Sequence, residues 1–171
     1  MLWAFLTIGV IAAVILADQI SKILVLAYLF EDQVTLVEGV LRFTYVENRG
    51  MAFGLLADHR WVFIVASVLG IGFMAFYLFR YVRRTLSRVG LALVVGGGIG
   101  NMIDRLRLGF VVDFIDFYAF DFWMWVFNIA DAAVTVGGVL FALDLILELV
   151  GEIKAQKGGK AGADNEQGGL Q

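Results

Sequence analysis

Four long apolar stretches dominate the pattern of hydrophobic and polar positions along this chain of 171 residues. They lie at about residues 2–26, 61–79, 91–108 and 125–147. Each is close to the roughly 20 residues that a helix needs to cross the hydrocarbon core of a bilayer. The pattern therefore predicts four membrane-spanning helices. The first stretch has no charged start and is long, which is not typical of a cleaved signal peptide.

The segments between the apolar stretches carry different patterns. Val34–Val37 and the alternating residues Leu41–Val46 are typical of strands, and Glu38-Gly39 between them suits a turn. We therefore expect a small β-hairpin or sheet in the first connection. Residues 113–125 mix acids with many aromatic side chains, which favours a loop at the level of the lipid headgroups.

Composition narrows the class of protein. Hydrophobic residues make up 61% of the chain, so we expect residues 1–150 to form one all-α integral membrane domain. Residues 151–171 are rich in Gly, Lys and Gln and predict a disordered tail. No basic patch with interleaved aromatics is present, so nucleic acid is not an expected partner. With no cysteine and one histidine, neither a disulfide framework nor a thiolate or multi-histidine metal site can form, and no cofactor is expected.

The basic residues predict the orientation in the membrane. The segment Arg80–Arg88 carries four arginines, and Lys154, Lys157 and Lys160 follow the fourth apolar stretch. The positive-inside rule places both segments in the cytoplasm. Four spans then put both termini in the cytoplasm and the connections 30–60 and 109–124 on the outer side.

With this topology, the polar residues that interrupt the apolar stretches converge near the outer leaflet, where Asn48 and Asp113 lie on the two outer connections. Ionisable groups at membrane depth are costly and persist where they pair, face a cavity or do chemistry. One shared site explains why several separate segments supply them. The candidate residues are Asp18, Lys22, Asn48, Asn101, Asp104, Arg105, Asp113, Asn128 and Asp131.

Structural roles are open for several of these residues. Asp18 and Lys22 are four apart on one helix face and could pair with each other. Asn128 could cap the fourth helix. The glycines at 96, 97, 98 and Gly100 could let helices approach closely.

Other polar residues have simpler interpretations. Arg105 could extend along the helix end to the interface. Asp144 and Glu148 share a helix face, and Asp144 lies roughly 20 Å along the helix from Asp131. We expect both acids to be solvated at the cytoplasmic boundary.

Two carboxyl groups, Asp113 and Asp131, stand in a polar group that has no serine, cysteine or histidine nucleophile. Two close carboxyls share one proton, so one can accept a proton from water while the other donates to a scissile carbonyl. Hydrolysis by such a pair inside a membrane is one hypothesis. A proton- or ion-coupled transporter is a second, because buried acids also relay protons. A binding or assembly protein without catalysis is a third.

Five separated motifs favour the first hypothesis. They are Asp18-Gln19-x-x-Lys22, Asn48-Arg49-Gly50-Met51-Ala52-Phe53, Gly97-Gly98-Ile99-Gly100-Asn101-x-x-Asp104-Arg105, Gly109-x-Val111-Val112-Asp113-Phe114 and Phe127-Asn128-x-Ala130-Asp131. In this order they resemble lipoprotein signal peptidase (signal peptidase II), a family of bacterial membrane aspartyl proteases. The resemblance runs from Asp18 to about Gly138.

The resemblance implies a fold, an activity and roles for residues. It implies a four-helix membrane bundle with a small outer sheet in the bacterial inner membrane. Asp113 and Asp131 would form the catalytic pair of an endopeptidase that cuts diacylglyceryl-modified prolipoproteins just before the lipidated cysteine. The expected inhibitors are globomycin-type peptides, and the expected state is a monomer among membrane lipids. Residues implied to bind substrate or support the site are Asn48, Asn101, Arg105, Asn128, Gly100, Asp18, Lys22 and Asp104.

Overall fold

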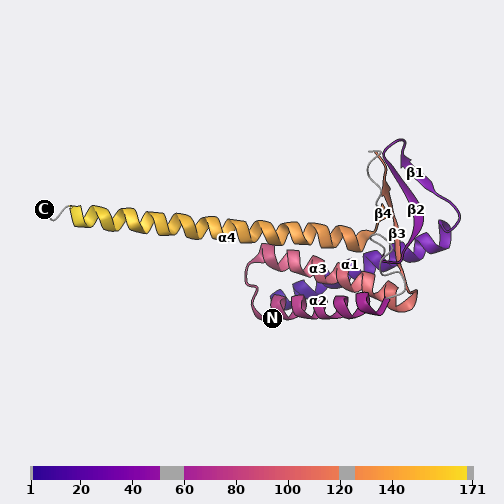
Figure 1. Cartoon of the computed structure of the whole chain (residues 1–171), viewed down its shortest axis with the longest axis horizontal. Coiled ribbons are helices and arrows are strands. Elements are labelled where there is room, and N and C mark those ends of the chain that lie inside the picture. The colour runs from indigo at the N-terminus through magenta and orange to yellow at the C-terminus, as the bar shows by residue number, and fades with distance from the viewer. Residues whose placement is uncertain (1, 51–59, 120–125, 169–171) are drawn as a thin grey trace.

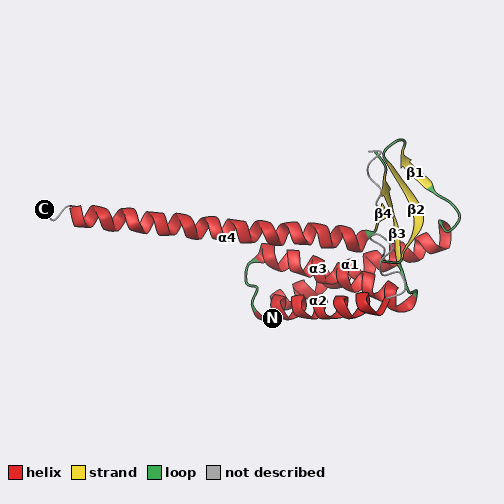
Figure 2. Cartoon of the chain, viewed as in Figure 1, coloured by secondary structure: helices red, strands yellow, loops and turns green. Residues whose placement is uncertain are grey.

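Helices form most of the molecule, and a small sheet stands at one end of them (Figure 1). The computed structural model describes residues 2–50, 60–119 and 126–168. The helices are α1 (Leu2–Tyr28), α2 (Arg60–Arg80), α3 (Thr85–Arg107) and α4 (Ile129–Gly168). The strands are β1 (Val34–Val37), β2 (Leu41–Asn48), β3 (Val111–Phe117) and β4 (Val126–Phe127), as Figure 2 shows.

Helix α3 is the centre of the bundle, because α1, α2 and α4 all pack against it. The packed core near its first half contains Leu78, Val82, Leu91, Ala92 and Val95. Large apolar side chains elsewhere on the helices point outward, including Leu69 and Phe73 on α2. An exposed apolar surface of this kind is expected where lipid replaces water.

Three of the described helices are long and apolar enough to cross a membrane. They are α1, α3 and the part of α4 from Ile129 to Ala155. The apolar part of α2, Ile64–Arg80, is shorter. The structure is therefore that of a mostly helical membrane bundle, in which three described helices are long enough to span and α2 is a shorter apolar helix.

The sequence pattern predicted the first two helices closely but not all helix ends. Helix α3 begins at Thr85. The end of the arginine-rich segment, which was expected to connect two helices, therefore forms the first helical turn of α3. Helix α4 begins at Ile129 rather than 125 and continues to Gly168, where the composition predicted a disordered tail. The absence of proline and the Ala, Lys, Glu and Gln residues after Gly151 favour helix, although the glycines of this segment oppose it.

The predicted hairpin is present as β1 and β2, which pair antiparallel. Gly39 in the turn between them has φ +72°, a backbone conformation that glycine adopts at little cost. The hairpin is, however, only half of an antiparallel sheet with the strand order β1-β2-β3-β4.

Strand β3 corrects the expectation that residues 113–125 form a loop. Its sequence Val-Val-Asp-Phe-Ile-Asp-Phe is rich in β-branched and aromatic residues, which favour strands. Val112 and Phe114 are buried against Val25 near the end of α1, so β3 fastens the sheet to the helices. Residues 120–125, which include several of the aromatics expected at the headgroup level, lie outside the described residues, as do 51–59.

Candidate active site

The start of α4 places Asn128 and Asp131 against each other. Asn128 Oδ1 accepts a hydrogen bond from the backbone N–H of Asp131 at 2.9 Å. In return, the Asp131 carboxylate accepts one from the backbone N–H of Asn128 at 3.3 Å. This reciprocal pattern is a capping box, in which the residue before a helix and the third residue of its first turn satisfy each other's donors. The capping role considered for Asn128 is confirmed.

The same Asn128 side chain also reaches Asp113. Its Nδ2 donates to Asp113 Oδ1 at 2.6 Å, and Asn128 is fully buried at 0% exposure. Asp113 Oδ2 accepts a second hydrogen bond, from Asn48 Nδ2 at 2.9 Å. Asp113 and Asp131 are therefore joined through one asparagine, although they lie on β3 and α4.

A buried ion cluster supports this pair from the side of α1. Lys22 Nζ lies 2.9 Å from Asp18 Oδ2 and 2.8 Å from Asp104 Oδ2, and it donates to Asn101 Oδ1 at 2.9 Å. Three acceptors match the three donors of an ammonium group. Burial of a lysine costs several kcal/mol unless it is paired and hydrogen-bonded in this way.

Asn101 connects this ion cluster to Asp131. Its Nδ2 donates to Asp131 Oδ1 at 2.7 Å, while its Oδ1 accepts from Lys22 and, at 3.2 Å, from Asn128. Hydrogen bonds therefore hold both the oxygen and the nitrogen of the Asn101 side-chain amide. One continuous polar network leads from Lys22 to Asp131.

Asp18 and Asp104 tie the network to the backbone. Asp18 Oδ1 accepts from the backbone N–H of Ala130 in the first turn of α4, at 3.0 Å. Asp104 Oδ2 accepts from the backbone N–H of Val112 at 3.1 Å. The first turn of a helix has donors without intrahelical partners, and Asp18 satisfies one of them from another helix. The two acids thus fix α4 and β3 relative to α1 and α3.

Gly100 allows this approach. A Cβ at this position would stand 2.6 Å from Asp18 Oδ2, closer than a real Cβ comes to another atom. The close-packing role considered for this glycine is confirmed for the contact between α1 and α3.

Arg105 lies half-buried near the end of α3 and interacts electrostatically with Asp131, Asp113 and Asp104. A guanidinium group stays positive and cannot compete as a base. It can therefore stabilise negative charge at the site without taking part in proton transfer.

The environment of Asp113 changes its acidity. The pKa of Asp113 is raised from 3.8 to about 6, chiefly by burial and in smaller part by the negative charge of Asp131. The hydrogen bonds from Asn48 and Asn128 and the charge of Lys22 act in the opposite direction. A carboxyl group with a pKa near 6 can exchange a proton close to neutral pH, as acid–base catalysis requires.

The structure brings the sequence-predicted site residues together. Gln19 belongs to the same network although it was not singled out as a site residue. Its Nε2 donates to Asp104 Oδ1 at 2.9 Å and to the Gly100 carbonyl at 3.2 Å. The sequence signal that could have identified Gln19 as a site residue is its place in the motif Asp18-Gln19-x-x-Lys22. Among the described residues no buried side-chain nitrogen or oxygen lacks a hydrogen-bond partner.

A bundle of apolar helices that holds two aspartates in one largely buried polar network defines a class: membrane proteins equipped for aspartic acid–base chemistry. Comparison with known proteins identifies the family. The family model described as "Signal peptidase (SPase) II" matches residues 10–147. The chain belongs to the signal peptidase II family, whose members are membrane aspartyl proteases.

Individual relatives agree over most of the chain. The lipoprotein signal peptidase of Clostridioides difficile (strain 630) is 44% identical over 139 residues, which is 81% of this chain and 93% of that protein. The lipoprotein signal peptidase of Syntrophomonas wolfei is 40% identical, over 82% of this chain and 92% of that protein.

Solved structures show the same fold. Two described as "Bacterial membrane enzyme structure by the in meso method" each align with a TM-score of 0.76. They are 27% and 28% identical and cover 84% and 81% of this chain, and 88% and 91% of their own chains.

Proposed function

We propose that this protein is an aspartic endopeptidase of the membrane that removes the signal peptide from prolipoproteins, with Asp113 and Asp131 as its catalytic pair. Family membership and relatives that are 40–44% identical support the activity. One observation supports the pair most directly: Asn128 hydrogen-bonds to both aspartates. Asp113 is buried on β3 and Asp131 is half-buried at the start of α4, and together they hydrogen-bond to the side chains of Asn48, Asn101 and Asn128.

The geometry suggests how the pair cleaves an amide bond. One carboxylate accepts a proton from water, whose oxygen attacks the carbonyl carbon, while the protonated partner donates to the carbonyl oxygen. The tetrahedral intermediate then collapses, the C–N bond breaks, and the amine leaves with a proton from the pair. Asn48, Asn101 and Asn128 orient the carboxyl groups, and Arg105 stabilises the negative charge that develops.

The substrate fits the position of the site. We infer that the substrate is a diacylglyceryl-modified prolipoprotein, cut just before the lipidated cysteine, so that its acyl chains stay in lipid. The sheet and Asp113 lie at one end of the bundle and the arginine-rich connection of α2 and α3 lies at the other (Figure 1). Four spans with both termini in the cytoplasm of a bacterium would place the site near the outer leaflet of the inner membrane.

A cleavage assay tests the proposal. The purified full chain is incubated in detergent with diacylglyceryl-modified precursor or with the unmodified precursor, with and without globomycin. We expect cleavage of the lipid-modified precursor alone and its loss with globomycin. Asp113→Asn and Asp131→Asn are expected to lower the rate at least about 100-fold, because each removes a proton-transfer group. Full activity of either variant would remove the pair from the mechanism.

The transporter alternative has no support in the family match or the relatives. It would require solute or ion flux through proteoliposomes that depends on Asp131. Cleavage without such flux is the expected outcome.

A further inference from the structure

A second buried polar cluster lies far along α4 from the catalytic pair. Asp144 was expected to be solvated, but it is only 2% exposed. The Ser87 hydroxyl and the Ser87 backbone N–H both donate to Asp144 Oδ2, and Arg84 Nη2 lies 2.9 Å from Asp144 Oδ1. Ser87 is in the first turn of α3, where backbone donors lack intrahelical partners. Asp144 therefore caps α3 from α4 and fixes Arg84 at the helix start.

A polar cavity of about 230 Å³ adjoins this cluster. It is lined by the arginine-rich connection of α2 and α3 and by α4, and its polar lining includes Arg83, Arg84, Tyr81 and Glu148. The volume is several times the roughly 30 Å³ that one water molecule takes up in the liquid. The cavity is therefore large enough for a phosphodiester group.

An apolar groove of about 490 Å³ lies beside the polar cavity, between α2, α3 and α4. The two spaces share Tyr77 and Phe141 as lining residues, so they adjoin. The groove is otherwise lined by apolar residues such as Phe73, Met74 and Leu91. A polar cavity joined to an apolar groove has the shape and chemistry of a site for one amphiphile.

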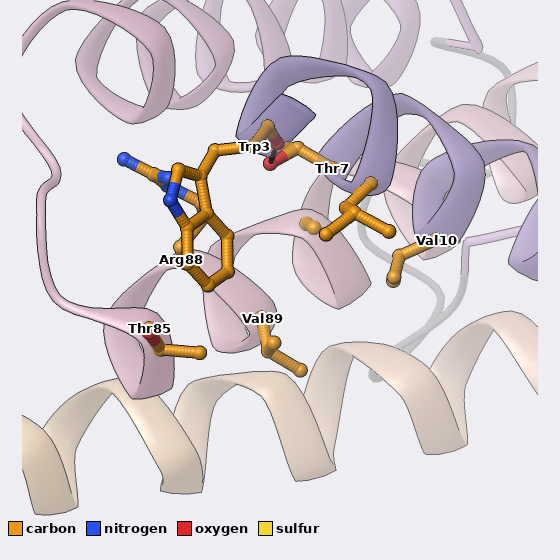
Figure 3. Close-up of a pocket in the computed structure, with 8 residues that line it drawn as sticks. Trp3, Thr7, Val10, Thr85, Arg88 and Val89 are labelled. Atoms are coloured by element: carbon orange, nitrogen blue, oxygen red, sulfur yellow. Dashed lines mark hydrogen bonds between the residues drawn. The ribbon is translucent and has the colours of Figure 1, made fainter. Parts of the chain in front are cut away.

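The charges at this end favour an anionic headgroup. Four arginines fall among residues 80–88. Arg88 faces away from the cavity: its guanidinium lies 5.5 Å from the Trp3 ring, in the separate small pocket between α1 and α3 that Figure 3 shows, and it donates to the Val82 carbonyl. Arg80 lies over Tyr81. Arg83 and Arg84 line the cavity together with Glu148, and Arg84 also pairs with Asp144 through Nη2, so Arg83 is the main cation for a phosphate there.

We propose that this end of the bundle binds one anionic phospholipid, with its phosphate at Arg83 and Arg84 and an acyl chain in the groove beside Tyr77. Basic pockets between membrane helices bind anionic headgroups for the same electrostatic reason. The site does not use the catalytic pair, because Asp144 lies roughly 20 Å along α4 from Asp131. It is a lipid site in addition to the substrate site.

Native mass spectrometry of the full chain in detergent tests the proposal. The probes are dioleoyl phosphatidylglycerol and dioleoyl phosphatidylcholine, which have the same acyl chains and differ in net charge. We expect one phosphatidylglycerol to bind at least about fivefold more tightly. Inorganic phosphate at millimolar concentration is expected not to displace it, because the acyl chain contributes to binding.

Paired variants locate the site. Arg83→Gln is expected to weaken phosphatidylglycerol binding about fivefold, whereas Arg80→Gln, which removes the same charge from outside the cavity, changes it less than about twofold. Gly138 lines the groove, and a Cβ there meets nothing within 4 Å. Gly138→Leu has room for its Cβ, should narrow the groove and should weaken binding at least about tenfold, whereas Gly151→Leu, whose Cβ is also in open space on α4, should not.

Four outcomes would overturn the proposal. Equal loss in Arg83→Gln and Arg80→Gln would show general attraction to charge, and equal binding of both lipids would show no headgroup site. Displacement by inorganic phosphate would indicate an anion site without an acyl chain. Unchanged lipid binding with a raised KM for the precursor in Gly138→Leu would assign the groove to the signal helix. Cleavage by wild-type protein is measured separately, so failure of the proposed protease function is distinguishable.

Discussion

Asn128 has two separable roles, because its carbonyl and amide ends face different partners. The carbonyl oxygen caps α4 at Asp131, and the amide nitrogen donates to Asp113. An aspartate at this position keeps a capping oxygen but has no donor for Asp113. The site can therefore be tested with the helix start preserved.

We predict that Asn128→Asp folds but loses activity. Aspartate caps helices as well as asparagine does, so α4 should still begin at the same residue, but the carboxylate buried beside Asp113 should lower the unfolding temperature at neutral pH. The new carboxylate beside Asp113 should lower the cleavage rate at least about 100-fold, because it replaces a donor by a like charge. Asn128→Ala is the comparison: it should lose about 1 kcal/mol of stability as well. Wild-type cleavage by Asn128→Asp would contradict the orienting role of the amide.

The pH dependence of cleavage follows from Asp113. Its pKa is raised to about 6, chiefly by burial, so its protonated form is lost as the pH rises through 6. If the pair works with one shared proton, kcat/KM should fall above pH 6 by about tenfold per unit. The measurement is kcat/KM from pH 4.5 to 8.5, and a constant value between pH 5 and 8 would contradict it.

Asn48 provides an internal check on this assignment. Its hydrogen bond favours the ionised form of Asp113 and so lowers the pKa. Asn48→Ala should therefore move the falling limb of the pH profile to higher pH. A shift to lower pH, or none, would mean that another group sets the limb.

At the scale of elements, the contact between α1 and α3 depends on a missing side chain at Gly100. We predict that Gly100→Ala separates these helices and costs about 1–3 kcal/mol, because its Cβ would overlap the carboxylate of Asp18. Gly72→Ala on α2 is the control, since a Cβ there meets nothing within 4 Å and alanine favours helix. Thermal unfolding in detergent measures both. Equal effects would show that the close approach does not matter.

The sequence predicted the helices better than the sheet. Apolar length alone located α1 and α2, and the alternation in Leu41–Val46 located the hairpin. Strand β3 was missed because Asp113 and Asp116 interrupt its apolar pattern, and their partners, Asn48 and Arg42, come from β2. Local patterns carry no information on such distant partners.

The distance along the chain between a polar residue and its partners also explains which predictions for polar residues were confirmed and which were wrong. Asp18 and Lys22 pair within one helix, so their spacing predicted the contact. Asp144 is held by Ser87 on α3 and by Arg84 just before that helix, so its spacing from Asp131 predicted solvation wrongly. Most of the site residues were found because they are polar in an apolar segment, whereas Asn48 and Asp113 lie on the outer connections and were found from the topology and the family resemblance.

At the scale of the whole molecule, α4 is longer than a bilayer requires. Its 40 residues span about 60 Å, whereas α3 with 23 residues spans about 35 Å. In Figure 1 the C-terminal half of α4 extends past the other helices, on the side away from the sheet. The two ends of the molecule are therefore different in kind: one carries the sheet and site, the other the arginines and the free length of α4.

The absence of cysteine makes the orientation directly measurable, because any introduced cysteine is the only one in the chain. Glu38→Cys places it in the exposed turn of the hairpin, and Lys154→Cys places it on the exposed part of α4. With the sheet outside and the basic end inside, a membrane-impermeant maleimide should label Glu38→Cys in intact spheroplasts and Lys154→Cys only after permeabilisation. Both variants should cleave precursor, which confirms that they are folded. Labelling in the reverse order would place the catalytic pair at the cytoplasmic face, where a translocated, lipid-anchored precursor could not present its scissile bond.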